Sequence, residues 1–226
     1  IVKYKKRRNS QNRRTRKERE ILINRTYEDF TNYISKNPDV NIVEMDTVVG
    51  LKEESDCFLT LLWRKSKFML IFKLESQTTN EVSRIFNILQ ELIPYEEYKR
   101  LFQVILTDNG HEFFDVNNIE CIQSTGEYVT HLFFCDPHMS CQKGMIEKNH
   151  EFIRYILPKG SSFKNFTQED CDLFMNNINS LCRDSLNGKC PYEAMLFLCD
   201  EYILKKLNCY FIEPDKVVLN DSLLKY

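Results

Sequence analysis

Residues 40–73 read VNIVEMDTVVGLKEESDCFLTLLWRKSKFMLIFK and contain three runs of β-branched and other apolar residues. The runs cover residues 40–50, 57–63 and 67–73, and the polar stretch Arg64-Lys65-Ser66 separates the last two. Strand-length apolar runs divided by polar turns are typical of consecutive strands. We therefore expect the chain to begin its sheet with three successive strands, the second and third of which form a hairpin.

The sequence after residue 73 alternates between helical and strand patterns. Apolar residues recur every three or four positions in four segments, which we expect to be helices: residues 78–93, 142–157, 167–183 and 191–207. Residues 101–106 look like a buried strand, residues 109–114 like a turn or short helix, and residues 119–134 like one or two short strands. This order predicts an α/β fold with a mixed central sheet of about five strands and helices on both faces.

The formal net charge of the 226 residues is −2, but the charges are unevenly distributed. Residues 1–19 hold ten Lys or Arg and one acid, a charge of +9, so the rest of the chain carries −11. A basic run of this density is either a solvated tail or a phosphate-binding segment. The candidate phosphate contacts in this arm are Lys5, Lys6, Arg7, Arg8, Arg13 and Arg14.

Composition excludes several classes of protein and suggests a division of the chain. No apolar run approaches the ~18 residues of a membrane span, so we expect no membrane partner. The nine Cys are scattered and odd in number, which favours reduced thiols in a cytoplasmic protein over a secreted disulfide framework. We divide the chain into a basic arm or linker at residues 1–36, a core at residues 37–200 and an extension at residues 201–226.

Three acidic residues stand out by their positions. Asp46 interrupts an apolar strand, where an isolated carboxylate needs a partner or a metal. Asp108 directly follows an apolar strand, at the end of the strand where ligands bind in open α/β sheets. Glu147 lies on the polar face of a helix. Each has a simpler interpretation, as an edge residue, a turn former and a solvated side chain respectively, so only their combination indicates a site.

Three local motifs hold these acids: Glu44-Met45-Asp46-Thr47-Val48-Val49-Gly50, Thr107-Asp108-Asn109-Gly110-His111-Glu112-Phe113 and Gln142-Lys143-Gly144-Met145-Ile146-Glu147-Lys148-Asn149-His150-Glu151. In this order, with 38 residues between Asp108 and Glu147, they closely resemble the catalytic core of bacterial insertion-sequence transposases with an Asp-Asp-Glu site. The resemblance runs from about residue 40 to residue 220 and includes the tail Pro214-Asp215-Lys216-Val217-Val218-Leu219.

The resemblance implies a retroviral-integrase-like core of RNase H type that acts on DNA. It implies that Asp46, Asp108 and Glu147 are catalytic and hold two Mg²⁺ ions, for which Mn²⁺ can substitute. Water would nick the transposon ends, and the freed 3′-hydroxyl would then join them to target DNA. The implied partners are inverted-repeat ends, target DNA and further copies of the chain, as a homodimer or higher oligomer at the bacterial nucleoid. Relatives carry a helix-turn-helix before this core, which we expect upstream of residue 1.

Other residues of the three motifs have expected supporting roles. The residues expected to shape the loops beside the acids are Asn109, Glu112, Gln142 and Gly144. The candidate phosphate contacts on the helix of Glu147 are Lys143, Lys148 and Arg154. The alternative is that these cations are ordinary solvated helix charges. Cys135, His138 and Cys141 lack a fourth ligand at a common zinc spacing, so a zinc site is the less favoured interpretation.

Two other functions compete with an active transposase core. One is a catalytically silent DNA-binding module derived from a transposase, and the presence of all three acids disfavours it. The other is an RNase H-like endonuclease that cleaves without joining, and the integrase-like motifs disfavour it.

Overall fold

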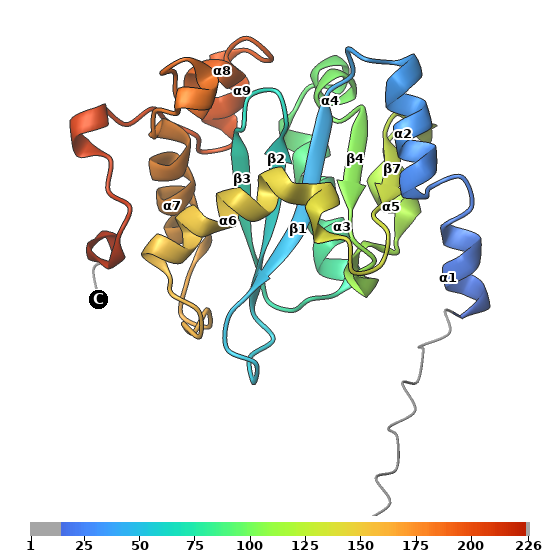
Figure 1. Ribbon diagram of the computed structural model, residues 1–226, viewed down its shortest axis with the longest axis horizontal. Coiled ribbons are helices and arrows are strands. Elements are labelled where there is room, and N and C mark those ends of the chain that lie inside the picture. Colours follow the sequence, from blue (N-terminus) through green and yellow to red (C-terminus); the bar gives the residue numbers. More distant parts are fainter. Residues whose placement is uncertain (1–14, 225–226) are drawn as a thin grey trace, which may run out of the picture.

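The structure, a computed structural model, describes residues 15–224, which fold around a five-stranded mixed sheet (Figure 1). The strands are β1 (Ile42–Val49), β2 (Cys57–Trp63), β3 (Met69–Leu74), β4 (Val104–Thr107) and β7 (His131–Phe134). Their order across the sheet is β3-β2-β1-β4-β7. A separate pair, β5 (Cys121–Ile122) and β6 (Glu127–Tyr128), forms a small antiparallel ribbon.

The directions of the strands identify the fold class. β1 pairs antiparallel with β2, which pairs antiparallel with β3. β1 also pairs in parallel with β4, which pairs in parallel with β7. An antiparallel meander of three strands extended by two parallel ones is the arrangement of the RNase H-like fold. The predicted α/β class and the predicted sheet of five strands are therefore confirmed.

Helices cover both faces of the sheet, with α6 on the near face in Figure 1 and α3 on the far face. The helices of residues 15–224 are α1 (Arg16–Ile21), α2 (Tyr27–Lys36), α3 (Thr79–Leu92), α4 (Tyr95–Leu101), α5 (Val116–Glu120), α6 (Gly144–Ile156), α7 (Gln168–Ser180), α8 (Pro191–Met195) and α9 (Glu201–Lys206). Because both faces are covered, all seven residues of the inner strand β2 are buried.

The helix α2 packs on the edge strand β7 and belongs to the folded body. Phe30 is 1% exposed and its ring contacts the ring of Phe133 at 5.7 Å between centroids. Just before α2, Arg25 forms an ion pair with Glu120 of α5 at 2.7 Å. Residues 27–36, which the sequence assigned to an arm or linker, therefore contribute to the hydrophobic core.

The helix α7 lies against β3, the strand at the opposite edge of the sheet. Asn179 accepts the backbone N–H of Met69 at 2.9 Å and donates to the carbonyl of the same residue at 2.8 Å. Gln168 accepts the backbone N–H of Lys73 at 2.9 Å and donates to the carbonyl of Ile71 at 3.0 Å. Side chains of a helix thus bind backbone groups that an edge strand would otherwise present to water.

Two expectations about secondary structure are wrong. Residues 101–106 were expected to form a strand, but Leu101 is the last residue of α4, whose N-cap is Pro94, and β4 begins only at Val104. Proline is compatible with a helix start because its missing N–H needs no partner there. The expected helix at residues 191–207 is two helices, α8 and α9, and Asp200 is the N-cap of the second.

The longest helix among residues 15–224 is α3, with 14 residues. None of the helices in this part of the chain combines the length and the apolar character that crossing a membrane requires.

Candidate active site

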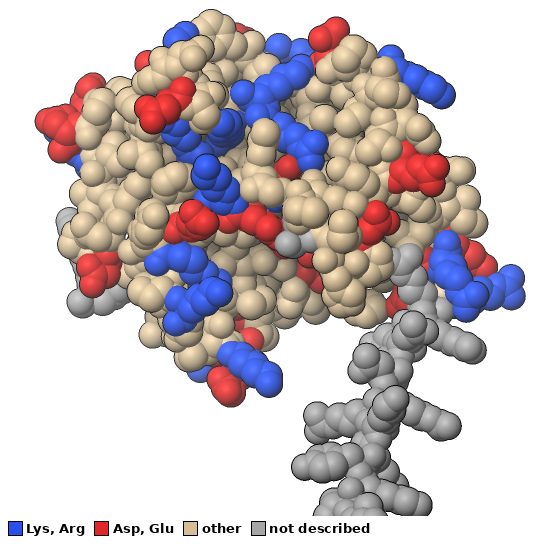
Figure 2. All heavy atoms as spheres, viewed as in Figure 1, with Lys and Arg blue, Asp and Glu red and all other residues tan. Residues whose placement is uncertain are grey.

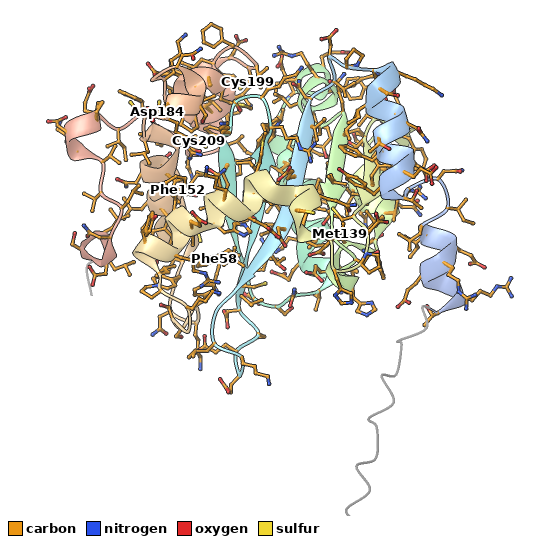
Figure 3. All side chains as sticks on the ribbon, in the orientation of Figure 1. Phe58, Met139, Phe152, Asp184, Cys199 and Cys209 are labelled. Carbon is orange, nitrogen blue, oxygen red and sulfur yellow. The ribbon has the colours of Figure 1, made fainter. Side chains whose placement is uncertain are left out.

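The three acids identified from the sequence come from three elements and line one pocket. Asp46 lies within β1, Asp108 directly follows β4, and Glu147 lies in the first turn of α6. The parallel register of β1 and β4, continued by two residues, sets Asp108 beside Asp46. All three line a pocket of about 280 Å³. Met139, which also lines this pocket, is labelled in Figure 3 and shows where the pocket lies.

Asp46 is a largely buried carboxylate with a shifted pKa. Its Oδ1 atom accepts the backbone N–H of Thr47 at 2.9 Å and lies 3.2 Å from Nζ of Lys143. Burial raises the pKa of Asp46 to about 6, and the nearby carboxylate of Asp108 contributes to the increase, while Lys143 and the Thr47 N–H oppose it. The carboxylate therefore depends on positive charge in its surroundings to stay ionised.

Lys143 supplies that positive charge. Its Nζ atom lies 3.2 Å from Asp46 Oδ1, 3.1 Å from Asp108 Oδ2 and 3.3 Å from the carbonyl oxygen of Met45. Burial lowers the pKa of Lys143, but the two carboxylates raise it, and the net shift is upward. The ammonium group is therefore a fixed cation between two of the three acids.

The expected position of Lys143 on the exposed face of the helix is wrong. Its side chain is only 3% exposed. The helix α6 begins at Gly144, so Lys143 precedes it, with φ −113° and ψ 35°, and does not follow its helical spacing. A spacing of four residues from Glu147 suggested a shared face, but that inference requires both residues to be helical.

The loop after β4 is fixed by its own side chains. Oδ1 of Asp108 accepts the backbone N–H of Gly110 at 2.9 Å, which is an Asx turn. Asn109 donates from Nδ2 to the carbonyl of Cys135 at 2.6 Å, which ties this loop to the end of β7. Asn109 therefore links the loop beside Asp108 to the segment that follows β7.

Glu112 also supports this loop, and its side chain is buried and tightly packed. It is 5% exposed, and its Oε1 atom accepts from the Thr47 hydroxyl at 2.9 Å and from Nε2 of Gln77 at 2.6 Å. A Cβ atom added at Gly110 would lie 2.5 Å from Glu112 Oε2. A larger residue at this position of the Asp-Asn-Gly-x-Glu motif would therefore force the carboxylate of Glu112 to shift.

A buried ion pair fixes the start of α6, and the sequence did not reveal it. Glu44, 1% exposed, accepts from Nε of Arg64 at 2.7 Å and from the backbone N–H of Ile146 at 2.7 Å. Arg64 also donates from Nη2 to the carbonyl of Gln142 at 3.0 Å. We call Glu44 and Arg64 the α6 clamp. Because Glu147 directly follows Ile146, the clamp determines where this acid lies relative to β1.

His150 anchors the middle of α6 to the sheet. Its Nε2 atom lies 2.9 Å from the hydroxyl of Thr60, and that hydroxyl donates to the carbonyl of Asp46 at 3.0 Å. The Thr60 hydroxyl donates its one proton to the Asp46 carbonyl, so it can only accept a hydrogen bond from His150. The proton of neutral His150 is therefore assigned to Nε2. Burial lowers the pKa of His150 to about 3, with contributions from Lys143 and Arg154. His150 is therefore a neutral structural link.

The remaining predicted site residues have different surroundings. Lys148 is exposed on α6, and Arg154 is partly buried and donates to the carbonyl of Val49 at 3.1 Å. Gln142 binds Asp136 through both its amide oxygen and its amide nitrogen, at 2.7 and 2.9 Å, and Gly144 is the exposed first residue of α6. The predicted arm contacts, Lys5, Lys6, Arg7, Arg8, Arg13 and Arg14, lie outside the described residues.

The three carboxylates are suited to a hard divalent cation. Carboxylate oxygens are the preferred ligands of Mg²⁺, and the Lys143 ammonium occupies a position between Asp46 and Asp108 that favours positive charge. Within residues 15–224, no three His, Cys, Asp or Glu side chains are grouped to hold a metal ion. The carboxylates are of the right chemical type for a divalent cation, but binding one would require Lys143 to move aside and the three acids to come closer together.

One cysteine lines the pocket of the three acids, and its thiol is unsuited to metal binding. Cys135 follows β7 and lines the same pocket. Burial raises the pKa of the Cys135 thiol to about 12, although Lys143 lowers it. Zinc binds the thiolate form, so this thiol is a poor ligand in its present surroundings.

Comparison with known proteins gives relatives that agree with the motifs. The chain is 32% identical to the putative integrase ORF3 of Spiroplasma virus SpV1-R8A2 B over 162 residues, which are 72% of this chain and 48% of that protein. It is 30% identical to the transposase InsI for insertion sequence element IS30C of Escherichia coli over 67% of this chain and 37% of that protein. It is 28% identical to the transposase for insertion sequence element IS1086 of Cupriavidus metallidurans, over 67% and 42% respectively.

These relatives are longer than the chain, which spans less than half the length of each of the three. No family model matches the chain. The names of these relatives, transposase and integrase, nevertheless agree with the family that the sequence motifs indicate. The chain is therefore a homologue of the insertion-sequence transposases and integrases, over about two thirds of its own length.

Proposed function

We propose that the chain is the catalytic core of a transposase, which cleaves DNA at transposon ends and joins the freed 3′-hydroxyl to target DNA. The observation that carries the proposal is the convergence of Asp46, Asp108 and Glu147 on one pocket. The names of the relatives support it. Because the chain spans less than half of these relatives, its activity, its DNA substrates and its assembly into a homodimer or higher oligomer are all part of the proposal.

Asp46, Asp108 and Glu147 are the residues that would hold the metal ions, Mg²⁺ or, as a substitute, Mn²⁺. Two bound ions supply the positive charge that activates an attacking oxygen and stabilises a leaving oxygen in phosphodiester transfer. Lys143 holds Asp46 and Asp108 together, and its ammonium group would have to move aside for a cation to bind between them.

The other residues of the site act by positioning these acids. The α6 clamp holds the first turn of α6 against β1, and His150 holds the next turns against β2 through Thr60. The Asx turn and Glu112 fix the loop that presents Asp108. Fixed ligands matter because displacement by a fraction of an ångström lowers the rate of phosphoryl transfer.

The proposal is tested with a labelled duplex that carries the terminal inverted repeat of the element encoding the chain, together with plasmid DNA. We expect cleavage at the end of the repeat and joining to the plasmid, both dependent on Mg²⁺ or Mn²⁺ and both abolished by Asp108→Asn. Joining that persists in Asp108→Asn would overturn the assignment of the site. DNA binding without chemistry would favour the silent module, and cleavage without joining would favour the endonuclease.

A further inference from the structure

A second pocket, of about 400 Å³, lies on the other side of α6 from the three acids, and three cations line it. Lys67 comes from the turn between β2 and β3, Lys148 from α6, and Arg183 from the segment after α7. We call these three residues and the space between them the basic pocket. Figure 3 labels two of its other lining residues, Phe152 on α6 and Asp184 above it, and Figure 2 shows Lys and Arg side chains near the centre of this face.

Arg183 is a partly buried cation whose partners are all uncharged. Its Nη1 atom donates to the side-chain oxygen of Asn149 at 2.6 Å and its Nη2 atom to the carbonyl of Ile178 at 3.3 Å. The guanidinium group lies over the ring of Phe152, 4.6 Å from the centroid. Its buried Nε atom has no hydrogen-bond partner. A buried guanidinium with a free donor and no carboxylate partner is unfavourable unless a ligand completes its surroundings.

The three cations of the basic pocket repel one another. Burial lowers the pKa of Lys67, and the charges of Arg183 and Lys148 lower it further. Burial also lowers the pKa of Arg183 to about 10. Among residues 15–224, no ion pair joins any of the three to an Asp or Glu side chain. Asp184 also lines the pocket but pairs with none of the three cations, so three positive charges and one negative charge leave the pocket with a net positive charge.

The backbone at Lys67 is also unusual. Its φ of 56° lies in the left-handed region, which a long side chain rarely adopts. Glycine or asparagine would be expected at such a turn position on conformational grounds. The lysine side chain at this position therefore adds a charge to the basic pocket in a backbone conformation that is unfavourable for it.

We propose that the basic pocket binds a phosphate group of the DNA backbone, with the Arg183 guanidinium group as its central charge and Lys67 and Lys148 as flanking charges. The inference rests on the proposed action on DNA and assigns a specific contact to it. Lys148 directly follows Glu147, so the basic pocket and the acidic pocket flank the same turn of α6. A phosphate bound here would hold the DNA strand at a fixed distance from the phosphate that is cleaved.

The direct test is the signal of the Arg183 Nε–H group in ¹H–¹⁵N NMR spectra of the described chain, assigned with the Arg183→Lys variant. We expect this signal to shift when a short duplex DNA is added, and to shift in the same direction with a high concentration of inorganic phosphate. No shift with the duplex, under conditions where other signals report binding, would overturn the proposal.

The second test compares the salt dependence of DNA affinity between matched variants. The double variant Lys67→Asn, Lys148→Ala removes two charges and keeps the left-handed turn accessible, because asparagine tolerates that conformation. We expect it to bind duplex DNA about tenfold more weakly and to reduce the slope of log K against log salt by about 1, the value for one lost phosphate contact. The control is Lys36→Ala at the end of α2, at the opposite edge of the sheet, which should change neither quantity.

The outcomes separate this proposal from the proposed function. If the wild-type chain cleaves and joins DNA while the double variant binds like Lys36→Ala, the basic pocket is not a phosphate site and the function stands. If the Arg183 signal shifts with DNA but no cleavage or joining occurs with any divalent cation, the phosphate site stands and the catalytic function does not.

Discussion

The carboxylate of Glu44 accepts the backbone N–H of Ile146 at 2.7 Å, and it thereby joins the central strand of the sheet to the first turn of α6. A helix N-terminus has unpaired N–H groups, and a carboxylate is a favourable partner for them. The bond matters beyond stability because it is made by the residue next to Glu147. The position of the candidate catalytic acid Glu147 therefore depends on Glu44, which is 1% exposed and has no proposed part in the reaction.

Glu44→Gln should weaken both the fold and the activity. The amide keeps the shape but loses the charge that Arg64 pairs with, and a charged hydrogen bond of this kind contributes about 2–3 kcal/mol. We expect chemical denaturation to report a loss of that size, and DNA cleavage to fall at saturating metal. Glu53→Gln, at an exposed position, is the matched control and should behave like wild type. Wild-type cleavage in Glu44→Gln would show that the clamp does not position Glu147.

Glu147→Gln should separate activity from stability. Within residues 15–224 no hydrogen bond or ion pair holds this side chain, so its replacement should change the free energy of unfolding by less than about 0.5 kcal/mol. DNA cleavage should nevertheless fall about 100-fold or more, because the proposed metal site would lose one of its three charged ligands. Thermal melting and the oligonucleotide assay on the same preparation test this. A large loss of stability would indicate a structural role for Glu147 instead.

His150 should make the stability of the fold depend on pH. Its pKa is about 3 in the folded state against 6.5 for the free side chain, so below pH 6.5 the unfolded state binds a proton that the folded state does not. Stability is therefore fully present above that pH and decreases as the pH falls towards 3. Acidification from about pH 7.5 to about pH 5 should cost about 2 kcal/mol through this group alone.

The pH effect of His150 is measured as a difference between wild type and His150→Gln, which keeps a donor for Thr60. The comparison is needed because the pKa of Asp46 is raised to about 6 in the folded state, so on acidification the folded state takes up this proton before the unfolded state does. Asp46 therefore stabilises the fold as the pH falls and opposes the effect of His150. We expect the wild type to lose more stability on acidification than the variant. Parallel stability curves for the two proteins would contradict the assignment of His150 as neutral and buried.

Gly110→Ala should be destabilising for a reason that a second substitution can reveal. The added Cβ would lie 2.5 Å from Glu112 Oε2, and steric overlap of this kind costs about 1–3 kcal/mol. Glu112→Ala removes the obstructing carboxylate but loses the bonds to Thr47 and Gln77. In a double-mutant cycle by urea unfolding, the double variant should lose less stability than the sum of the singles, by about 0.5 kcal/mol or more. Additive losses would mean that the glycine is required for another reason.

Lys143→Ala should change the response of the protein to divalent cations. Removing the ammonium leaves Asp46 and Asp108 without their shared counter-ion, so the melting temperature without metal should fall. The same change frees the position that a cation would take, so the increase in melting temperature on adding Mg²⁺ or Mn²⁺ should be larger than in wild type. Equal increases in both proteins would show that metal binding does not involve displacement of Lys143.

The strands and the main helices were predictable because each has a local signature in the sequence. β2, buried along its whole length, is a continuous apolar run, and α6 has apolar residues at helical spacing. The α4 helix was not predictable in the same way, since it is short and begins after Pro94. The buried residues of α4 are Tyr98 and Leu101. Two apolar positions are too few to distinguish a short helix from the start of a strand.

The three acids of the candidate site were found through their motifs, but the contacts that organise them were not. Arg64 lies in a hairpin turn, and only the folded sheet shows that it pairs with Glu44. Lys143 looked like a helical surface residue because its spacing from Glu147 is four, and the start of the helix one residue later reverses that conclusion. Such contacts join residues that are distant in sequence, so periodicity carries no signal of them.

The bonds of Asn179 and Gln168 to β3 have a consequence for assembly. A bare outer strand can recruit a strand from a neighbouring molecule, and that is a common route by which sheets extend across an interface. Here Met69 has both of its backbone groups bound by Asn179, and Gln168 binds groups at Ile71 and Lys73. Strand addition at β3 is thereby blocked, so an assembly of several copies of this chain could not form by continuing the sheet at that edge.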